Sequence, residues 1–191
     1  MKFPTRRMVP LALIAALLAT APLGATTLLQ MNLGDLTQRA DRIFRGTVID
    51  VTPGTVSVGG AELPTTTYRL RVEESFKGDA DLVKGDQAMI EVQMIGSIKK
   101  EGPRGDLVKF SAFRDVPRLT MGGDYLLFTT APSAAGLSTT VGLAQGAFTV
   151  FVLDRQEYAV NGFNNGGLGL DSAGPALYDD LSAKINALLG N

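Results

Sequence analysis

The sequence predicts a mainly β fold, an antiparallel sandwich or barrel built from six or seven short strands. Three observations support this class. Segments rich in β-branched and aromatic residues recur at fairly regular spacing, several of them alternate apolar and polar residues, and glycine-containing turns separate them. Little helix lies between these segments, which argues against a parallel sheet. The length of 191 residues fits a single such domain.

Residues 1–25 have the parts of a secretory signal peptide. Three basic residues precede an apolar run at residues 8–23, and small residues follow it. The run is short for a membrane span, which needs about 20 apolar residues. We therefore expect cleavage after Ala25 and export of residues 26–191 as one domain, to the periplasm or the medium. An uncleaved N-terminal anchor and a twin-arginine signal are the alternatives.

The expected elements follow in chain order. A short helix at residues 33–40 leads into a first strand that ends before Pro53 and Gly54, and a Gly/Thr-rich loop then reaches Pro64. A turn at residues 154–156 joins the last two strands into a hairpin. The expected strands are residues 43–51, 66–73, 88–94, 107–113, 125–130, 147–152 and 157–160.

Two of these strands show how the core is built. In the strand at 66–73, Tyr68, Leu70 and Val72 alternate with charged residues, the pattern of a half-buried strand. The strand at 125–130 is apolar on both faces, as a central strand should be. Aromatic residues in strands are expected to pack in the core; they are Phe44, Tyr68, Phe76, Phe110, Tyr125, Phe128, Phe148 and Phe151.

A C-terminal helix is expected at about residues 175–189. Pro175 marks its start and Gly190 its stop. Leu177, Leu181, Ile185 and Leu188 form an apolar stripe. The helix is expected to pack against the strands, because it is too short and too polar for a membrane anchor.

The composition excludes most catalytic chemistry. The chain has no His and no Cys, so Ser-His-Asp and Cys-His nucleophiles and the usual ligand sets for zinc, copper, haem and iron–sulfur clusters are absent. We predict no cofactor, no metal site and no enzymatic activity. The 18 basic residues, three of them in the expected signal, face 19 acidic ones, which argues against a nucleic-acid surface.

Three short motifs carry weak signals. Residues 166–171 match one copy of a glycine-rich calcium repeat, but that repeat binds calcium between stacked copies. Ser97-x-x-Lys100 matches an acylating motif that elsewhere lies on a helix. Glu73 and Glu74 are adjacent in a strand and are expected on opposite faces. A surface loop, a solvated loop and ordinary surface acids are the preferred interpretations.

A family resemblance emerges from residues 40–48, 68–78 and 122–128. Together they resemble the strands of netrin-like domains, which include the tissue inhibitors of metalloproteinases, and are similar above all to exported bacterial proteins of that pattern. The resemblance covers about residues 40–152. It implies an antiparallel OB-like barrel, here of six or seven strands, with a short N-terminal helix and a C-terminal helix.

One departure from the family limits what the resemblance implies. The inhibitors chelate a catalytic zinc through a disulfide-bonded N-terminal Cys, whereas the expected mature start here is Thr26 and the chain has no Cys. The zinc-chelating mechanism therefore does not carry over.

We expect an exported, non-enzymatic module that binds an exported protein or a protease through its loops at 54–64 and 96–105, the loops that correspond to the contact ridge of the inhibitors. Lys99, Lys100 and Arg104 would form a basic spot for an acidic partner, with Thr26 as a further candidate. No nucleic acid and, after signal cleavage, no membrane is expected as a partner, and the oligomeric state is open. A carboxylate or Ser–Lys hydrolase and a structural envelope or matrix protein are the alternatives.

Overall fold

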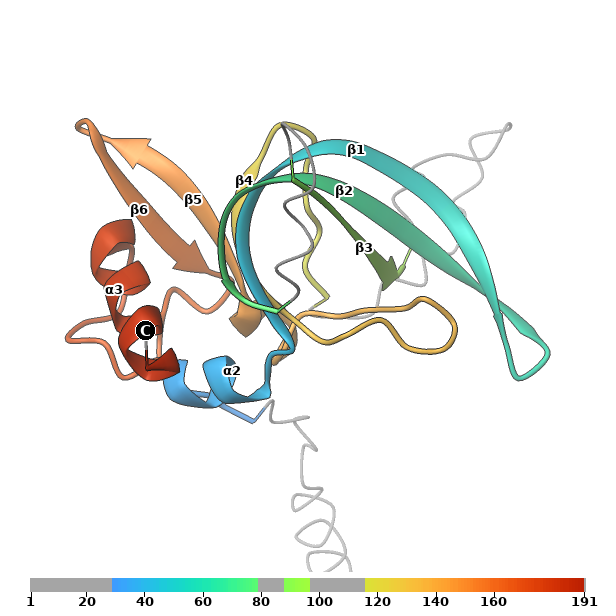
Figure 1. The fold of residues 1–191 in the computed structure, drawn as a ribbon, viewed down its shortest axis with the longest axis horizontal. Helices are drawn as coiled ribbons and strands as arrows, with labels where there is room; N and C mark the ends of the chain where they lie inside the picture. The colour runs from blue at the N-terminus through green and yellow to red at the C-terminus, as the bar shows by residue number, and fades with distance from the viewer. Residues whose placement is uncertain (1–28, 79–87, 97–115, 191) are drawn as a thin grey trace, which may run out of the picture.

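The structure is a computed structural model, and it describes residues 29–78, 88–96 and 116–190. Seven antiparallel strands form one sheet, and the described part of the chain also holds two α-helices (Figure 1), so the mainly β class with two helices is confirmed. No helix among the described residues is long and apolar enough to cross a membrane. The elements are α2 (Leu33–Arg39), β1 (Arg42–Val58), β2 (Ala61–Lys77), β3 (Met89–Ile95), β4 (Asp124–Thr129), the 3₁₀ turn η2 (Leu143–Gly146), β5 (Ala147–Leu153), β6 (Gln156–Asn161), β7 (Ala176–Leu177) and α3 (Tyr178–Leu189).

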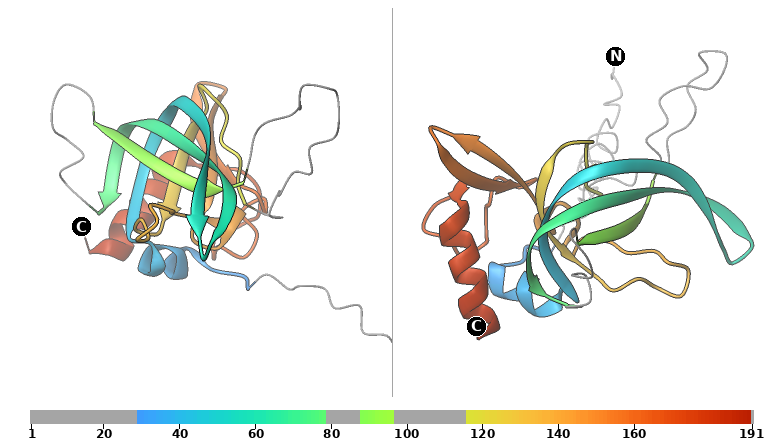
Figure 2. Two further views of the ribbon diagram at one scale, coloured as in Figure 1. Left: turned by 90° about the vertical axis from the view of Figure 1, so that its right-hand side faces the viewer. Right: turned by 45° about the horizontal axis from the view of Figure 1, so that its top comes forward.

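The sheet has the strand order β3-β2-β1-β4-β5-β6-β7, with every pairing antiparallel. β3 and β7 are its two edges, so the described strands form an open, strongly curved sheet (Figure 2) and not a closed barrel. The loop after β4 lies along the β3 edge, because the Ser138 N–H donates to the Gln93 carbonyl at 2.8 Å. The same loop returns to the end of β4, where the Thr130 N–H donates to the Thr139 carbonyl at 2.9 Å.

β1 and β2 are both longer than the sequence analysis predicted. The expected end of the first strand near Pro53 is wrong, because β1 continues to Val58 and the expected loop up to Pro64 belongs to the hairpin. Gly59 and Gly60 form the two-residue turn with φ of +59° and +81°, a conformation that glycine adopts without strain. Proline is tolerated here because these are edge positions, where no neighbouring strand needs its missing N–H.

The core consists of two clusters, one on each face of β4. Leu126 and Phe128 pack with α2 and α3, whereas Tyr125 and Leu127 pack with β1, β2 and β3. All four side chains are buried. The prediction that this strand is apolar on both faces is thus confirmed, and six of the eight aromatic residues expected in the core are buried. Phe151 is half-buried against Tyr158, and Phe110 lies outside the described residues.

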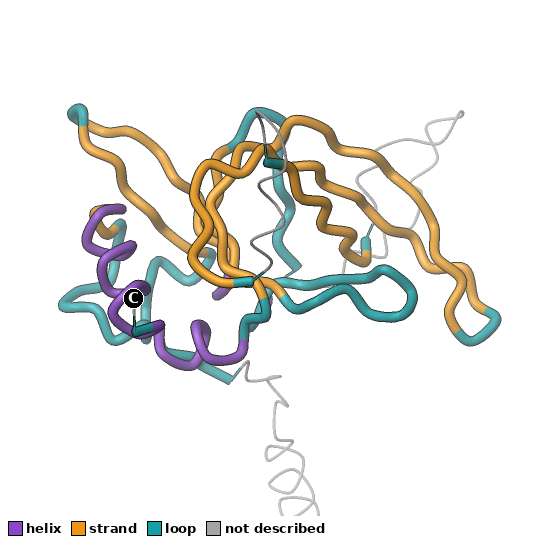
Figure 3. The backbone as a smooth tube through the Cα atoms, in the orientation of Figure 1, coloured by secondary structure: helices purple, strands orange, loops and turns teal. Residues whose placement is uncertain are grey.

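The helices form where the sequence supplies their ends. Asn32 caps α2, since its side chain accepts from the Asp35 N–H at 2.8 Å and its own N–H donates to the Asp35 carboxylate at 3.2 Å. α3 ends as predicted at Gly190, which has φ of +78°. The expected start at Pro175 is wrong, because Ala176 and Leu177 first pair with β6 as β7 and the helix begins at Tyr178 (Figure 3).

Two expectations cannot be compared with this structure. The signal peptide and its cleavage after Ala25 lie outside the described residues, and so does the strand expected at 107–113.

Candidate functional site

Beyond the rest of the sheet, β1 and β2 continue together as a two-stranded arm, which we define as residues 52–64. β4 pairs with β1 only as far as Thr47, and β3 pairs with β2 only from Thr65 onward. Among the described residues, the arm therefore has no strand on either side, and it curves away from the core (Figures 1 and 2). Glu62 is its one charged residue. A two-stranded hairpin of this kind is marginally stable by itself in water.

The two faces of the arm differ in polarity. Val56 lies opposite Leu63 and Val58 lies opposite Ala61, and directly opposed residues share a face. This face is apolar and accessible, with Val58 43% exposed. The other face is more polar, since it carries the pair of Ser57 with Glu62.

Each of the two edges of the arm carries one proline, which has no backbone N–H to donate. Counting from the two-residue turn, every second pair exchanges backbone hydrogen bonds, which leaves Pro53 and Pro64 at positions whose backbone groups point outward. The Pro64 carbonyl does point outward, because it accepts from the Gly96 N–H at 2.8 Å. Neither proline can donate to an added strand, so each edge lacks one of the outward N–H groups that strand addition would use.

The structure brings together the bases of the two loops that the sequence analysis selected. Besides the contact between Gly96 and Pro64, the Thr66 hydroxyl donates to the Gly96 carbonyl at 2.8 Å. The first loop is the arm itself, and the second starts beside the foot of the arm. Four selected residues lie outside the described residues, so their placement is not tested; they are Lys99, Lys100, Arg104 and Thr26.

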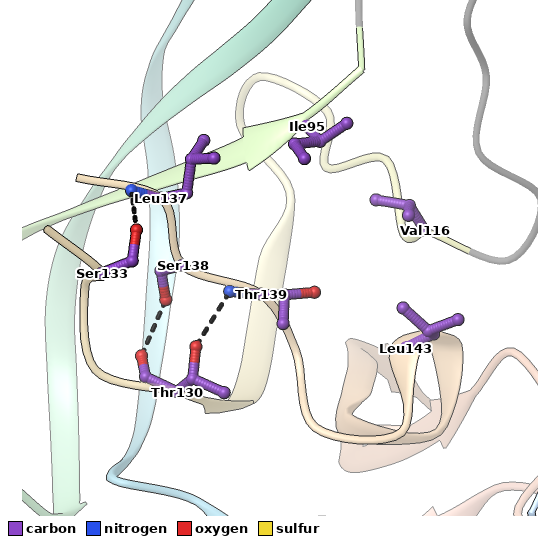
Figure 4. A pocket seen from close by; sticks show the side chains of 8 residues that line it. All are labelled: Ile95, Val116, Thr130, Ser133, Leu137, Ser138, Thr139 and Leu143. Carbon is purple, nitrogen blue, oxygen red and sulfur yellow. Dashed lines mark hydrogen bonds between the residues drawn. The ribbon is translucent and has the colours of Figure 1, made fainter. Parts of the chain in front are cut away.

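An apolar pocket of about 540 Å³ opens beside the β3 edge of the sheet (Figure 4). Aliphatic side chains from separate parts of the chain converge on it: Ile95 ends β3, Val116 precedes β4, Leu137 lies in the loop after β4 and Leu143 starts η2. The other lining residues carry hydroxyls; they are Thr130, Ser133, Ser138 and Thr139. No charged side chain of the described residues lines the pocket.

Hydrogen bonds inside the loop hold the pocket wall. The Ser138 hydroxyl donates to the Thr130 carbonyl at 2.7 Å, and the Thr130 hydroxyl accepts from the Thr139 N–H at 3.2 Å. The Ser133 hydroxyl accepts from the Leu137 N–H at 3.2 Å. These bonds, drawn in Figure 4, bind three of the four hydroxyls to the backbone, so the wall is preformed.

A polar cluster lies around Arg45 of β1, at the end of the sheet opposite to the arm. Its Nη2 lies 2.6 Å from Oδ2 of Asp124 and 2.6 Å from Oε1 of Glu157, and its Nε lies 3.8 Å from Glu73. The guanidinium carbon also lies 4.4 Å from the ring centroid of Tyr178, a cation–π distance. The Arg45 side chain is only 12% exposed. Arg45 thus connects β1 with β2, β4, β6 and α3.

Tyr178 extends this cluster to Glu74. Its hydroxyl donates to the Glu74 carboxylate at 2.6 Å, and the Ser182 hydroxyl donates to the same carboxylate at 3.3 Å. The expectation that Glu73 and Glu74 are kept apart is therefore wrong, because both carboxylates reach the pair formed by Arg45 and Tyr178. A β-bulge opposite Arg45 and Gly46 interrupts the regular alternation at this point.

The pKa shifts in the cluster follow from these contacts. Hydrogen bonding to Glu157 raises the pKa of Arg45, and the same contact lowers the pKa of Glu157. The Thr47 hydroxyl, followed by Arg71, lowers the pKa of Glu73, and burial raises the pKa of Tyr178. Carboxyls with a lowered pKa stay ionised at neutral pH and are poor proton donors. This favours ion pairing over a general-acid role for Glu73 and Glu157.

The glycine-rich segment at 166–171 is anchored to the fold. The Leu33 N–H donates to the Leu168 carbonyl at 3.0 Å, and the Leu168 side chain is buried. Just before it, the Asn165 amide donates to the carbonyls of Ala159 and Gly174. Among the described residues, no group of three or more acidic side chains is arranged to hold a metal ion. The Ser-x-x-Lys motif at 97–100 lies outside the described residues.

Comparison with models of known protein families finds no match, and comparison with characterised proteins finds no significant similarity in sequence. The site is therefore defined by its own geometry. The pocket has no signal in the sequence, because its lining comes from segments that are distant along the chain. The arm does have a signal, the pair Gly59-Gly60 preceded by the alternating Val56 and Val58.

Proposed function

We propose that this chain is a non-enzymatic module that binds a protein partner through the arm. The observation that carries the proposal is an apolar face, formed by Val56, Val58, Ala61 and Leu63, on a hairpin that no other described element covers. Such a hairpin contributes little to its own stability. A partner that covered this face would bury apolar surface that the chain now exposes to water.

The chemistry of the arm indicates what kind of partner it fits. The prolines at both edges disfavour the addition of a strand, and a nearly uncharged face disfavours nucleic acid and other polyanions. A complementary apolar surface on a folded protein matches it best. Lys99, Lys100 and Arg104 remain part of the proposal as basic contacts for acidic groups at the rim of the interface.

Export and an OB-like, netrin-like architecture remain parts of this proposal. Their support is the signal-like sequence of residues 1–25 and the loop after β4, which lies between the edge of β3 and the end of β4. A protease is one exported partner consistent with the resemblance, and the zinc-chelating contact is not part of the proposal.

Affinity capture with matched variants tests the proposal. We would immobilise the purified chain and identify proteins that it retains from the periplasm and the culture supernatant, and then titrate each as a purified protein. Val58→Asp adds a charge to the apolar face, and Val152→Asp adds the same charge to an exposed valine at the β5–β6 hairpin. We expect Val58→Asp to weaken binding at least tenfold and Val152→Asp to leave it unchanged.

Two results would contradict the proposal. One is a purified partner that binds both variants with the affinity of the unmodified chain. The other is retention of no protein at all, which would favour a structural role in the envelope or matrix.

A further inference from the structure

We infer that the pocket between β3 and the loop after β4 binds a small, uncharged aliphatic molecule that carries one hydroxyl or carbonyl group. This inference does not rest on the proposed function, because the pocket and the arm use different residues.

The size of the pocket is the first argument. Its volume of about 540 Å³ falls within the roughly 300–1,000 Å³ of small-molecule sites. A single side chain of a partner protein would fill only part of such a space. A molecule with a flexible chain of several methylene groups could contact all four aliphatic walls.

The lining determines the class of ligand. Ile95, Val116, Leu137 and Leu143 present aliphatic surface, and no described charged side chain lines the pocket. A charged ligand group would lose its hydration here without gaining a counter-ion. The ligand part inside the pocket is therefore uncharged and aliphatic.

One hydroxyl selects for a polar atom on the ligand. Three of the lining hydroxyls are hydrogen-bonded to the backbone of the loop, whereas the structure shows no hydrogen bond between the Thr139 hydroxyl and another described residue. In Figure 4 this hydroxyl points toward the space between Val116 and Leu143. It could donate to a carbonyl or exchange a hydrogen bond with a hydroxyl of the ligand.

Titration with 1-octanol tests the inference directly. We would label the methyl groups of the full chain with ¹³C and follow their NMR shifts as the alcohol is added. We expect saturable shifts at the methyls of Ile95, Val116, Leu137 and Leu143. Shifts that do not saturate, or equal shifts at exposed residues such as Val58 and Leu153, would show non-specific adsorption and overturn the inference.

Three variants sharpen the test. Leu137→Arg places a charge in the pocket and should abolish binding, while Leu153→Arg changes an exposed leucine at the β5–β6 hairpin and should preserve it. Thr139→Val keeps the shape but removes the hydroxyl, and should weaken octanol binding about 2- to 10-fold, the value of one hydrogen bond. Because Thr139→Val leaves the packing intact, it remains informative even if Leu137→Arg fails to fold. Unchanged affinity in Thr139→Val would overturn the role of that hydroxyl.

Discussion

The sheet has one end beside α2 and α3 and another at the arm (Figure 1), and the two ends differ in how well their side chains are paired and buried. At the end where α2 and α3 pack, a nearly buried arginine is paired with carboxylates, and the amide of Asn165 is hydrogen-bonded to backbone carbonyls. At the other end, the arm exposes Val58 and a pocket opens between β3 and the loop after β4. The ion-paired and buried contacts therefore lie in one part of the chain and the proposed binding surface in another, so that each can be changed without the other.

Substitutions in the core and in the arm should differ most in their effect on the free energy of unfolding. Phe148 is fully buried against Phe128, so Phe148→Ala should lower the free energy of unfolding by about 3–5 kcal/mol. Val58→Ala removes methyl groups from an exposed position and should change the free energy of unfolding by less than about 0.5 kcal/mol. Urea denaturation of both variants measures the difference. Equal losses would mean that the arm belongs to the cooperative core.

The Arg45 cluster should contribute less than the core but more than surface ion pairs. Arg45→Met leaves Asp124 and Glu157 without their cation and should cost about 2 kcal/mol, below the value of about 3–5 kcal/mol for fully buried pairs because Glu157 is 41% exposed. Arg69 pairs with Glu91 at the surface at 2.9 Å and provides the matched control. Arg69→Met should cost less than about 1 kcal/mol. A control variant as unstable as Arg45→Met would refute this ranking.

Acid should weaken the same cluster. The pKa values of Glu73 and Glu157 are lowered from an ordinary value of 4.5, so their contribution to stability is fully present above pH 4.5. This contribution is lost as the pH falls through the lowered pKa values that the two carboxyls have in the folded state. The urea midpoint should therefore fall as the pH drops below 4.5, and it should fall less steeply in Arg45→Met. Parallel pH profiles for the two proteins would rule out this contribution.

Substitutions in the two hairpin turns should change stability only slightly, and in opposite directions. The arm turns through two glycines, whereas the β5–β6 hairpin turns through Asp154 and Arg155 at φ of +49° and +65°. Replacement of Arg155 by Gly should stabilise the fold by about 0.5–1 kcal/mol, and Gly60→Ala should destabilise it by a similar amount. Thermal unfolding measures both shifts. Shifts of the same sign would show that backbone strain does not govern these turns.

Local patterns were sufficient to predict much of the fold. The alternation around Tyr68 and Leu70 correctly predicted the buried face of β2, and Gly190 correctly predicted the end of α3. These features depend on neighbouring residues in the chain. The length of the arm does not follow from the sequence, because Pro53 indicates the end of a strand, although a proline can also lie at an unpaired strand edge.

Features that depend on distant contacts could not be predicted. The carboxylates around Arg45 come from β2, β4 and β6, and a bulge changes the expected separation of Glu73 and Glu74. The pocket likewise depends on a loop that crosses to the edge of β3. Strand periodicity contains no information about either arrangement.

Hydrogen exchange in the presence of a captured and purified partner would show which end of the sheet the partner covers. We predict that the partner slows exchange of the amides in residues 52–64 and leaves those of α3 unchanged. Protection of α3 with no change in the arm would contradict the account, because the binding surface would then lie at the end of the sheet that we assign to stability.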